Sequence, residues 1–237
     1  MPGLGTIVNV AAILIGGLAG MFGGKLIPER YQKTLLSAMG VSVLFVGLAG
    51  ALSQMLYAED GTLHTQGTMM LIISLAAGAI LGELLDLEDR MERFGAWLRE
   101  KSGSQSDNSF INGFVTASLT VCIGAMAIVG AIQDGISGDH ATLFAKAVLD
   151  FVIVLVMAAS MGKGCMFSAI PVGILQGGVT LLAQLIRPVF TEQALANLSL
   201  TGSVLVFCVG LNLVWGKHIR VANLLPALIV SVIWAFF

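Results

Sequence analysis

Two charged residues stand out because they lie inside an apolar stretch. Lys146 and Asp150 are four residues apart within Leu143–Met161, so a helix would place both on one face. Asp150 lies about seven residues into the stretch, roughly 10 Å at the helical rise. A charge at that depth in a membrane costs about 2.5–3.5 kcal/mol. The pair is therefore either a closed structural ion pair or a site where Asp150 binds a cation or proton and Lys146 tunes it.

Uncharged polar residues also interrupt the apolar stretches. We predict an ion or solute site from the residues that could gather around the pair, namely Asp150, Lys146, Gln176, Gln133 and Asp134. Hydrogen bonding between helices is the alternative explanation for the uncharged ones. Other polar residues in such stretches are Asn9, Gln54, Thr116, Thr120, Gln184 and Asn212.

The remaining motifs do not favour an enzyme. Asp134, Asp139 and His140 could bind a divalent metal, but Asp-Gly and Ser-Gly-Asp turns explain them equally well. The three cysteines form no Cys-x-x-Cys motif. A hydrolase triad, a phosphate-binding loop and a dinucleotide fingerprint are also missing from the sequence. We therefore expect no catalytic activity, no cofactor and no metal.

The composition determines the class of protein that positions these residues. The chain has 237 residues, of which 57 % are hydrophobic and 11 % are charged, whereas soluble domains carry about a quarter charged residues. This predicts an all-α polytopic membrane protein with the lipid bilayer as its surroundings and no nucleic-acid partner. The eight predicted spans are Thr6–Leu26, Thr34–Tyr57, Thr68–Leu85, Phe110–Ile132, Leu143–Met161, Cys165–Ile186, Leu198–Trp215 and Val221–Phe237.

The basic residues between the spans predict an orientation. Lys and Arg are concentrated in the odd-numbered connections, and the even-numbered ones hold only Arg187. The positive-inside rule then places the odd-numbered connections in the cytoplasm and both termini outside.

The two ends of the chain resemble each other. Ile13-Leu14-x-Gly16-Gly17 is matched by Ile174-Leu175-x-Gly177-Gly178, and Leu36-Ser37-x-x-Gly40 by Leu198-Ser199-x-x-Gly202. Leu26-Ile27-Pro28 corresponds to Leu185-Ile186-x-Pro188. Matching segments are five spans apart in chain order (the first and the sixth, for example), an odd offset, so the copies would be inverted, as in many secondary transporters. Shared membrane composition is the alternative explanation.

These patterns give one membrane domain, 1–237, with internal divisions. The first three-span repeat is 1–82, two central spans occupy 110–164, and the second repeat is 165–237. Between the first two parts, residues 83–109 form a cytoplasmic amphipathic helix and a flexible linker. The helix is expected to anchor at the membrane interface or to dock a partner.

Small residues recur every four positions on two predicted spans. These are Gly16, Gly20 and Gly24 on the first and Gly78 and Gly82 on the third. Such spacing lets helix backbones approach closely. Packing within the chain is the simpler interpretation, and a homodimer face on the first span is the alternative.

The chain resembles the YqgA/YdfK-like family of bacterial integral membrane proteins, known as domain of unknown function 554. The resemblance covers nearly the whole chain. It depends on Thr6–Gly17, on Leu26–Arg30, on Gly124–Asp150, on Ser168–Pro171 and on Asn223–Leu228. It implies the bacterial cytoplasmic (inner) membrane and supplies no substrate or catalytic residue.

We therefore predict a membrane transporter or channel for an ion or small solute, with its site between the repeats near Lys146 and Asp150. The alternative is a membrane scaffold or regulatory protein that acts through the cytoplasmic helix without transporting anything.

Overall fold

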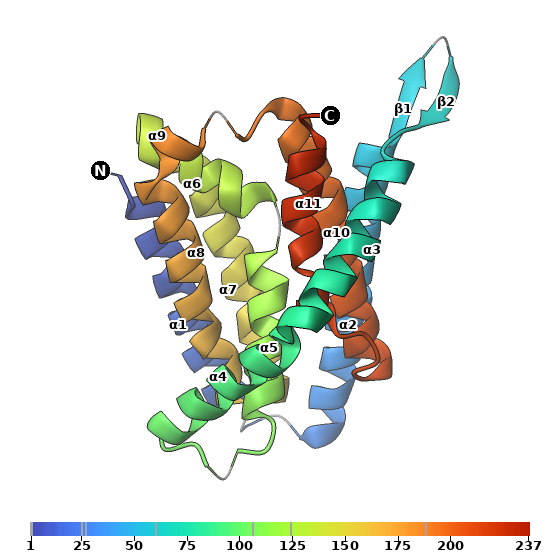
Figure 1. Cartoon of the computed structure of the whole chain (residues 1–237). Coiled ribbons are helices and arrows are strands. Elements are labelled where there is room, and N and C mark those ends of the chain that lie inside the picture. The colour runs from blue at the N-terminus through green and yellow to red at the C-terminus, as the bar shows by residue number, and fades with distance from the viewer. Residues whose placement is uncertain are drawn as a thin grey trace. The chain divides into compact units, whose positions relative to one another are not determined.

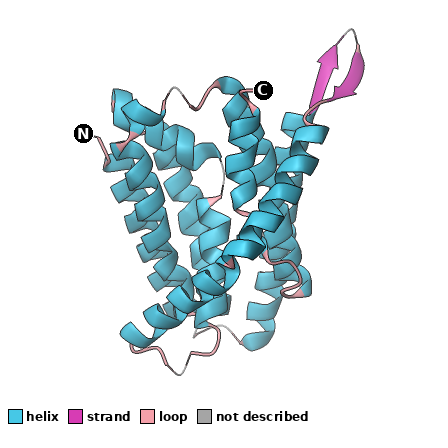
Figure 2. Ribbon diagram, viewed as in Figure 1, coloured by secondary structure: helices cyan, strands magenta, loops and turns pink. Residues whose placement is uncertain are grey.

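The computed structural model describes residues 2–24, 26, 28–59, 61–105, 107–123, 125–187 and 189–237. In this part of the chain, helices dominate and the strands form one hairpin (Figure 2). Three positions named in the sequence analysis, and one of the basic residues of the first connection, lie outside the described residues. The named positions are Ile27, Gly124 and Pro188, and the basic residue is Lys25.

The chain divides into two compact units, and each is described by itself. Unit 1 comprises Met1–Met39, Asp89–Cys122 and Met126–Ile186. Unit 2 comprises Gly40–Glu88, Ile123–Ala125 and Arg187–Phe237.

Unit 1 is helical (Figure 1). Its elements are α1 (Leu4–Gly24), the first part of α2 (Glu29–Met55), most of α4 (Leu87–Lys101), α5 (Phe110–Cys122), α6 (Ala125–Ser137), α7 (Ala141–Met161), the 3₁₀ helix η1 (Lys163–Ser168), α8 (Ala169–Leu181) and α9 (Ala183–Ile186).

Helices α1 and α7 form the framework of unit 1. The glycines of α1 lie against the main chain of α7, with Gly16 beside Phe151 and Gly20 beside the Leu155 carbonyl. A step of four residues along α1 corresponds to a step of four residues in the same direction along α7, so the two helices are parallel. A side chain at Gly20 would overlap that carbonyl, so only glycine permits the close approach.

A break between α7 and α8 turns the chain back. Helix α7 ends at Met161, and Gly162 follows with a φ of 80°, a conformation that glycine adopts readily. Pro171 lies in the first turn of α8, where its missing N–H costs little. Helix α8 then runs antiparallel to α1, because Gly17 lies beside Met166 while Val10 lies beside Gly173.

Unit 2 combines long helices with the hairpin. Its elements are the second part of α2, β1 (Leu56–Glu59), β2 (Thr62–Thr65), α3 (Thr68–Leu85), α10 (Glu192–Trp215), the 3₁₀ helix η2 (Val221–Leu224) and α11 (Pro226–Trp234). The strands pair antiparallel, from Leu56 opposite Thr65 to Glu59 opposite Thr62.

Glycines again mark the helix contacts in unit 2. Gly78 and Gly82 of α3 lie against the main chain at Ala227 and Asn223. The described partners of the five predicted packing glycines thus lie within this chain.

The prediction of an all-α polytopic membrane protein is confirmed. Six described helices are long and apolar enough to cross a membrane, or seven if the bent pair α5–α6 forms one span. That pair differs from the expected continuous span, because its helices meet at 61° across a short break. The eighth predicted span contains a shorter apolar helix, within Val221–Trp234.

The predicted cytoplasmic helix is separate from the third span. Asp86 has a φ of 47° and ends α3, and α4 begins at the next residue. On α4, Phe94 stacks on the exposed Trp97 and contacts Phe114 of α5 edge-on. Helix α4 is thus held to α5 on one side and presents an aromatic ring on another.

Candidate functional site

Lys146 and Asp150 form a buried ion pair near the middle of α7. Their exposed fractions are 7 % and 2 %, and Lys146 Nζ lies 2.9 Å from Asp150 Oδ1. Helix α7 begins at Ala141, so Asp150 lies roughly 14 Å from its first residue at the helical rise. At this depth Asp150 cannot reach the membrane surface, and its charge is balanced by protein groups.

Asn9 joins the pair to α8. Its Nδ2 donates to Asp150 Oδ2 at 2.9 Å and to Gln176 Oε1 at 3.2 Å. Asn9 and Gln176 are 0 % and 1 % exposed. Three helices of unit 1, α1, α7 and α8, therefore share one polar centre, which we call the buried cluster (Asn9, Lys146, Asp150 and Gln176).

The break after α5 supplies a further contact to the buried cluster. Helix α5 ends at Cys122, so its last carbonyls lack the donor that a continuing helix would provide. One of them, Val121 O, accepts a 2.8 Å hydrogen bond from Lys146 Nζ. Interrupted helices with free carbonyls are a recurring feature of ion sites in membrane transporters.

The buried cluster and its surroundings hold polar atoms without a partner in the described part of the chain. Within the cluster these are Asn9 Oδ1 and Gln176 Nε2. The Thr6 and Thr180 hydroxyls, both buried, also lack partners there. Thr6 precedes Asn9 by three residues and Thr180 follows Gln176 by four, so both lie on the cluster's face, toward the N-terminal end of α1. Unpaired buried polar groups are costly and call for an explanation.

Two predicted site residues lie elsewhere in unit 1. Asp134 is fully buried and accepts hydrogen bonds from the amides of Gly3 and Gly5, each at 3.0 Å. It thereby stabilises the positive end of α1. Gln133 accepts a 2.8 Å hydrogen bond from the Thr142 hydroxyl. Both residues hold the ends of helices together, and in the described part of the chain no hydrogen bond or ion pair joins either of them to the buried cluster.

The carboxylates near His140 do not assemble a metal site. His140 Nδ1 lies 2.9 Å from Asp134 Oδ1 without the alignment of a hydrogen bond. Asp139 is exposed and accepts from the Ala141 amide at the start of α7. In the described residues, no three His, Cys, Asp or Glu side chains are placed to hold a metal ion.

A polar pocket opens in unit 1 at the opposite end of α7. It is lined by the ends of α1 and α7 and by polar groups that include Gln32, Asp107, Ser160 and Lys163. The Ser160 hydroxyl donates to the Gln32 carbonyl, and Gln32 Nε2 donates to the Gly24 carbonyl. The pocket thus gives the α1–α7 pair a polar end on the side away from Asp134.

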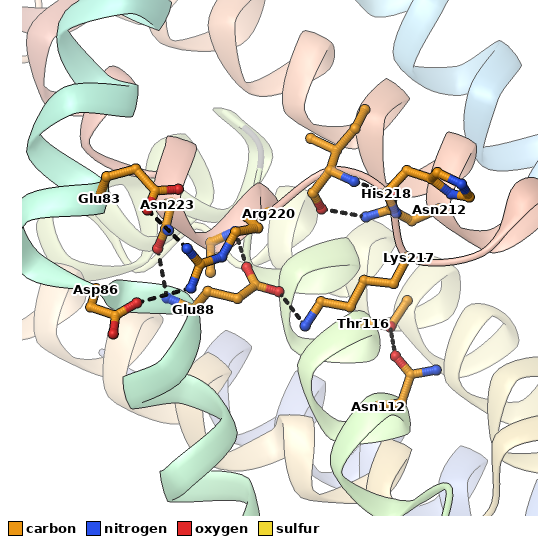
Figure 3. A network of polar contacts seen from close by, with 12 residues as sticks. Glu83, Asp86, Glu88, Asn112, Thr116, Asn212, Lys217, His218, Arg220 and Asn223 are labelled. Atoms are coloured by element: carbon orange, nitrogen blue, oxygen red, sulfur yellow. Dashed lines mark hydrogen bonds and ion pairs between the residues drawn. The ribbon is translucent and has the colours of Figure 1, made fainter.

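A second polar network, in unit 2, joins the α3–α4 junction to the loop before α11 (Figure 3). Glu88 is 3 % exposed, pairs with Lys217 at 2.7 Å and accepts from the Ala222 amide at 2.9 Å. Its own amide donates to Asn223 Oδ1 at 2.7 Å. Arg220 bridges Glu83 and Asp86, both exposed. Asn223 Nδ2 has no partner in the described residues, but the ion pairs and the other hydrogen bonds of this network still fasten the loop to the α3–α4 junction.

Sequence reasoning did not place Asn9 or Val121 in the site. Asn9 is one of several polar residues in apolar stretches, and nothing local shows which of them meet. The carboxyl end of α5 lies in the sequence stretch Phe110–Ile132, which reads as one continuous apolar run.

These features define a class. The chain is a polytopic α-helical membrane protein whose unit 1 buries a charged pair within its spans, beside an interrupted helix. The family described as "Protein of unknown function (DUF554)" matches residues 4–236. The chain belongs to this family.

Two relatives are similar over nearly their full length. The "Uncharacterized membrane protein YdfK" of Bacillus subtilis (strain 168) is 28 % identical over 232 residues, covering 98 % of this chain and 95 % of the relative. The "Uncharacterized protein YqgA" of Escherichia coli (strain K12) is 28 % identical over 232 residues, covering 96 % and 94 %. No solved structure matches the chain.

Proposed function

We propose that this protein is a transporter or channel for an ion or small solute, and that the buried cluster of unit 1 is its binding site. The observation that carries the proposal is the ion pair between Lys146 and Asp150, held in the middle of a span by Asn9 and Gln176. Ionisable groups inside membrane spans are costly, and they typically mark ion pathways or proton relays.

The packing of the helices is compatible with an inverted repeat, which would support transport. Matching spans of the two proposed repeats lie directly against each other: α1 contacts α8, and α3 contacts α11. Gly47 of α2 lies against Phe207 of α10 in the same way. Each pair is antiparallel, as inverted copies require.

The repeated glycines themselves differ in their surroundings. Gly16 and Gly17 lie against α7 and η1, whereas Cβ atoms at Gly177 and Gly178 would meet nothing within 4 Å. The glycine motifs of the two proposed copies therefore have different contacts. Support for the proposed repeat comes from the antiparallel helix pairs and not from these glycines.

Flux into proteoliposomes tests the proposal. Purified protein is reconstituted into the vesicles, and the external concentration of alkali cations, protons, carboxylates or amino acids is raised suddenly. The response is measured as charge movement across the membrane and as a change of the internal pH. We expect at least one solute to give a response that Asp150→Asn abolishes. The matched control is Asp139→Asn, because Asp139 is exposed and an asparagine can still cap α7. Equal responses in the wild type and Asp150→Asn would refute the assigned site.

A further inference from the structure

Four buried polar atoms in and beside the buried cluster need partners that the described part of the chain does not supply. They are Thr6 Oγ1, Asn9 Oδ1, Gln176 Nε2 and Thr180 Oγ1. The four residues are between 0 % and 7 % exposed. The atoms comprise an amide donor, an amide acceptor and two hydroxyls that can both donate and accept. Buried polar groups without a protein partner typically bind ordered water.

The charge of the buried cluster is compatible with water as the occupant. The Lys146 ammonium and the Asp150 carboxylate balance each other at 2.9 Å. The side chains that α1 and α8 direct toward them, Asn9 and Gln176, are neutral. Water leaves this balance unchanged, and one molecule can donate to an amide oxygen while it accepts from an amide nitrogen.

Polar groups continue from the buried cluster to the end of unit 1 at which α1 begins. Thr6 and Thr180 lie one helical turn from the cluster in that direction. Beyond them, the Gly5 amide donates to Asp134 Oδ2 at 3.0 Å. His140 Nδ1 lies 2.9 Å from the other oxygen of the same carboxylate, and its side chain is 17 % exposed. The series of polar groups therefore reaches the surface of unit 1.

The next turn in the opposite direction is apolar on all three helices. On each helix, the residue four positions beyond the cluster member lies on the same face and is buried. These residues, which we call the apolar layer, are Ile13 on α1, Val154 on α7 and Val172 on α8. On the polar side, α7 contributes the buried Leu143, so the polar groups there come from α1 and α8. Apolar constrictions exclude water and can gate a membrane pathway.

We infer that the four unpartnered atoms bind water, and that these waters form the entrance from the N-terminal end of α1 to Asp150. The apolar layer closes the path on the far side, so the structure describes a state that is hydrated from one end. The inference rests on the proposed transport function and names the route by which the solute enters its site. Passage to the other side of the membrane then requires the apolar layer to part.

Wild-type protein provides the first test, without any substitution. Its structure is determined in lipid nanodiscs at a resolution that shows ordered water. We expect water within hydrogen-bonding distance of Gln176 Nε2 and of the Thr6 or Thr180 hydroxyl, and no water beside the apolar layer. Helices that bring the four unpartnered atoms into direct hydrogen bonds with each other, without water, would overturn the inference.

Thr180→Cys and its matched control Val172→Cys provide the second test, each in a chain without the three native cysteines. Both positions are buried and lie four residues from Gln176 on the same face of α8, one on either side. Silver ions, which bind thiols, are added in chloride-free buffer to sealed vesicles of each orientation. The thiols that remain free are then counted with a maleimide after denaturation, and the chain without cysteines is the blank.

The thiol of Thr180→Cys should react with silver from the side of the membrane at which α1 begins. The thiol of Val172→Cys should react at least about tenfold more slowly, because a minor state that exposes it is populated to about 10 % at most. If either variant does not fold, the ordered waters of the wild type decide.

Three results would overturn the entrance: equal rates at the two positions, no reaction at position 180 in the folded protein, or faster reaction from the side at which α1 ends. Failure of the entrance can be told apart from failure of the transport proposal. Asp150-dependent flux together with an unreactive Thr180→Cys would refute the entrance alone. A panel without any Asp150-dependent flux would refute transport itself, and with it the role of the path as an entrance.

Discussion

Removal of one charge from the Lys146–Asp150 pair should destabilise the protein far more than removal of both. In Asp150→Asn, the Lys146 ammonium stays buried at 7 % exposure without a counter-charge. In Lys146→Met, the Asp150 carboxylate keeps one hydrogen bond, from Asn9. Stranding one member of a buried pair costs about 3–5 kcal/mol, so each single substitution should lower stability by that amount.

The double variant Asp150→Asn, Lys146→Met should recover most of this loss. The methionine fills the volume of the lysine stem, and an asparagine oxygen at position 150 can still accept from Asn9. Replacement of a whole buried pair is often neutral, so the coupling energy between the two positions should be about 5 kcal/mol or more. The double variant should nevertheless lack any flux or ligand response, because both charges are gone.

The free energy of unfolding of the four proteins, measured by steric trapping in bicelles, gives this coupling energy. Melting temperatures in the same detergent give the rank order independently. Two substitutions that add without coupling would show that the residues do not form a closed pair. Two harmless single substitutions would show that the site is open to water, contrary to the burial described above.

Three further predictions concern packing, the unit 2 network and topology. Gly20→Ala should lower the free energy of unfolding by about 1–3 kcal/mol, because the added methyl group forces α1 away from α7. The control Gly23→Ala should be neutral or slightly stabilising, because a Cβ there meets nothing within 4 Å. Equal unfolding free energies for the two variants would contradict the described packing. Glu88→Gln should lower the free energy of unfolding in detergent by about 1.5–3 kcal/mol, because it removes a charged hydrogen-bond partner. An unchanged free energy of unfolding would show that the network does not fasten its loop. A cysteine replacing Gly61 should react with an impermeant thiol reagent on intact cells, and one replacing Gly103 should not; the reverse would overturn the orientation.

The spans were predictable because a helix that crosses a membrane needs a long apolar segment, which is visible in the sequence. Helix α3 has the expected bounds, Thr68–Leu85, and α7 ends at the expected Met161. The i, i+4 spacing also brought Lys146 and Asp150 together, because this relation is local to one helix. Apolar runs and fixed spacings are properties of one segment, so a sequence shows them directly.

Contacts between distant segments were not predictable in the same way. The bond from Asn9 to Asp150 joins residues separated by 141 positions, and Glu88 of α4 pairs with Lys217 in the loop after α10. The break between α5 and α6 was missed because hydropathy does not register a change of direction inside an apolar run. The hairpin had a usable signal: Asp60-Gly61 lies between short alternating segments, a sequence typical of a tight β-turn.

Access to the buried cluster from both sides of the membrane tests the central claim most directly. Gln176→Cys, in a chain without Cys122, Cys165 and Cys208, places a thiol at the cluster and leaves the Lys146–Asp150–Asn9 contacts intact. The rate of reaction with a small charged thiol reagent is measured in right-side-out and in inside-out vesicles. A transporter or channel should react from both sides, because its site opens to each. A folded protein whose thiol stays unreactive from both sides would have a sealed, purely structural cluster, and the transport proposal would be wrong.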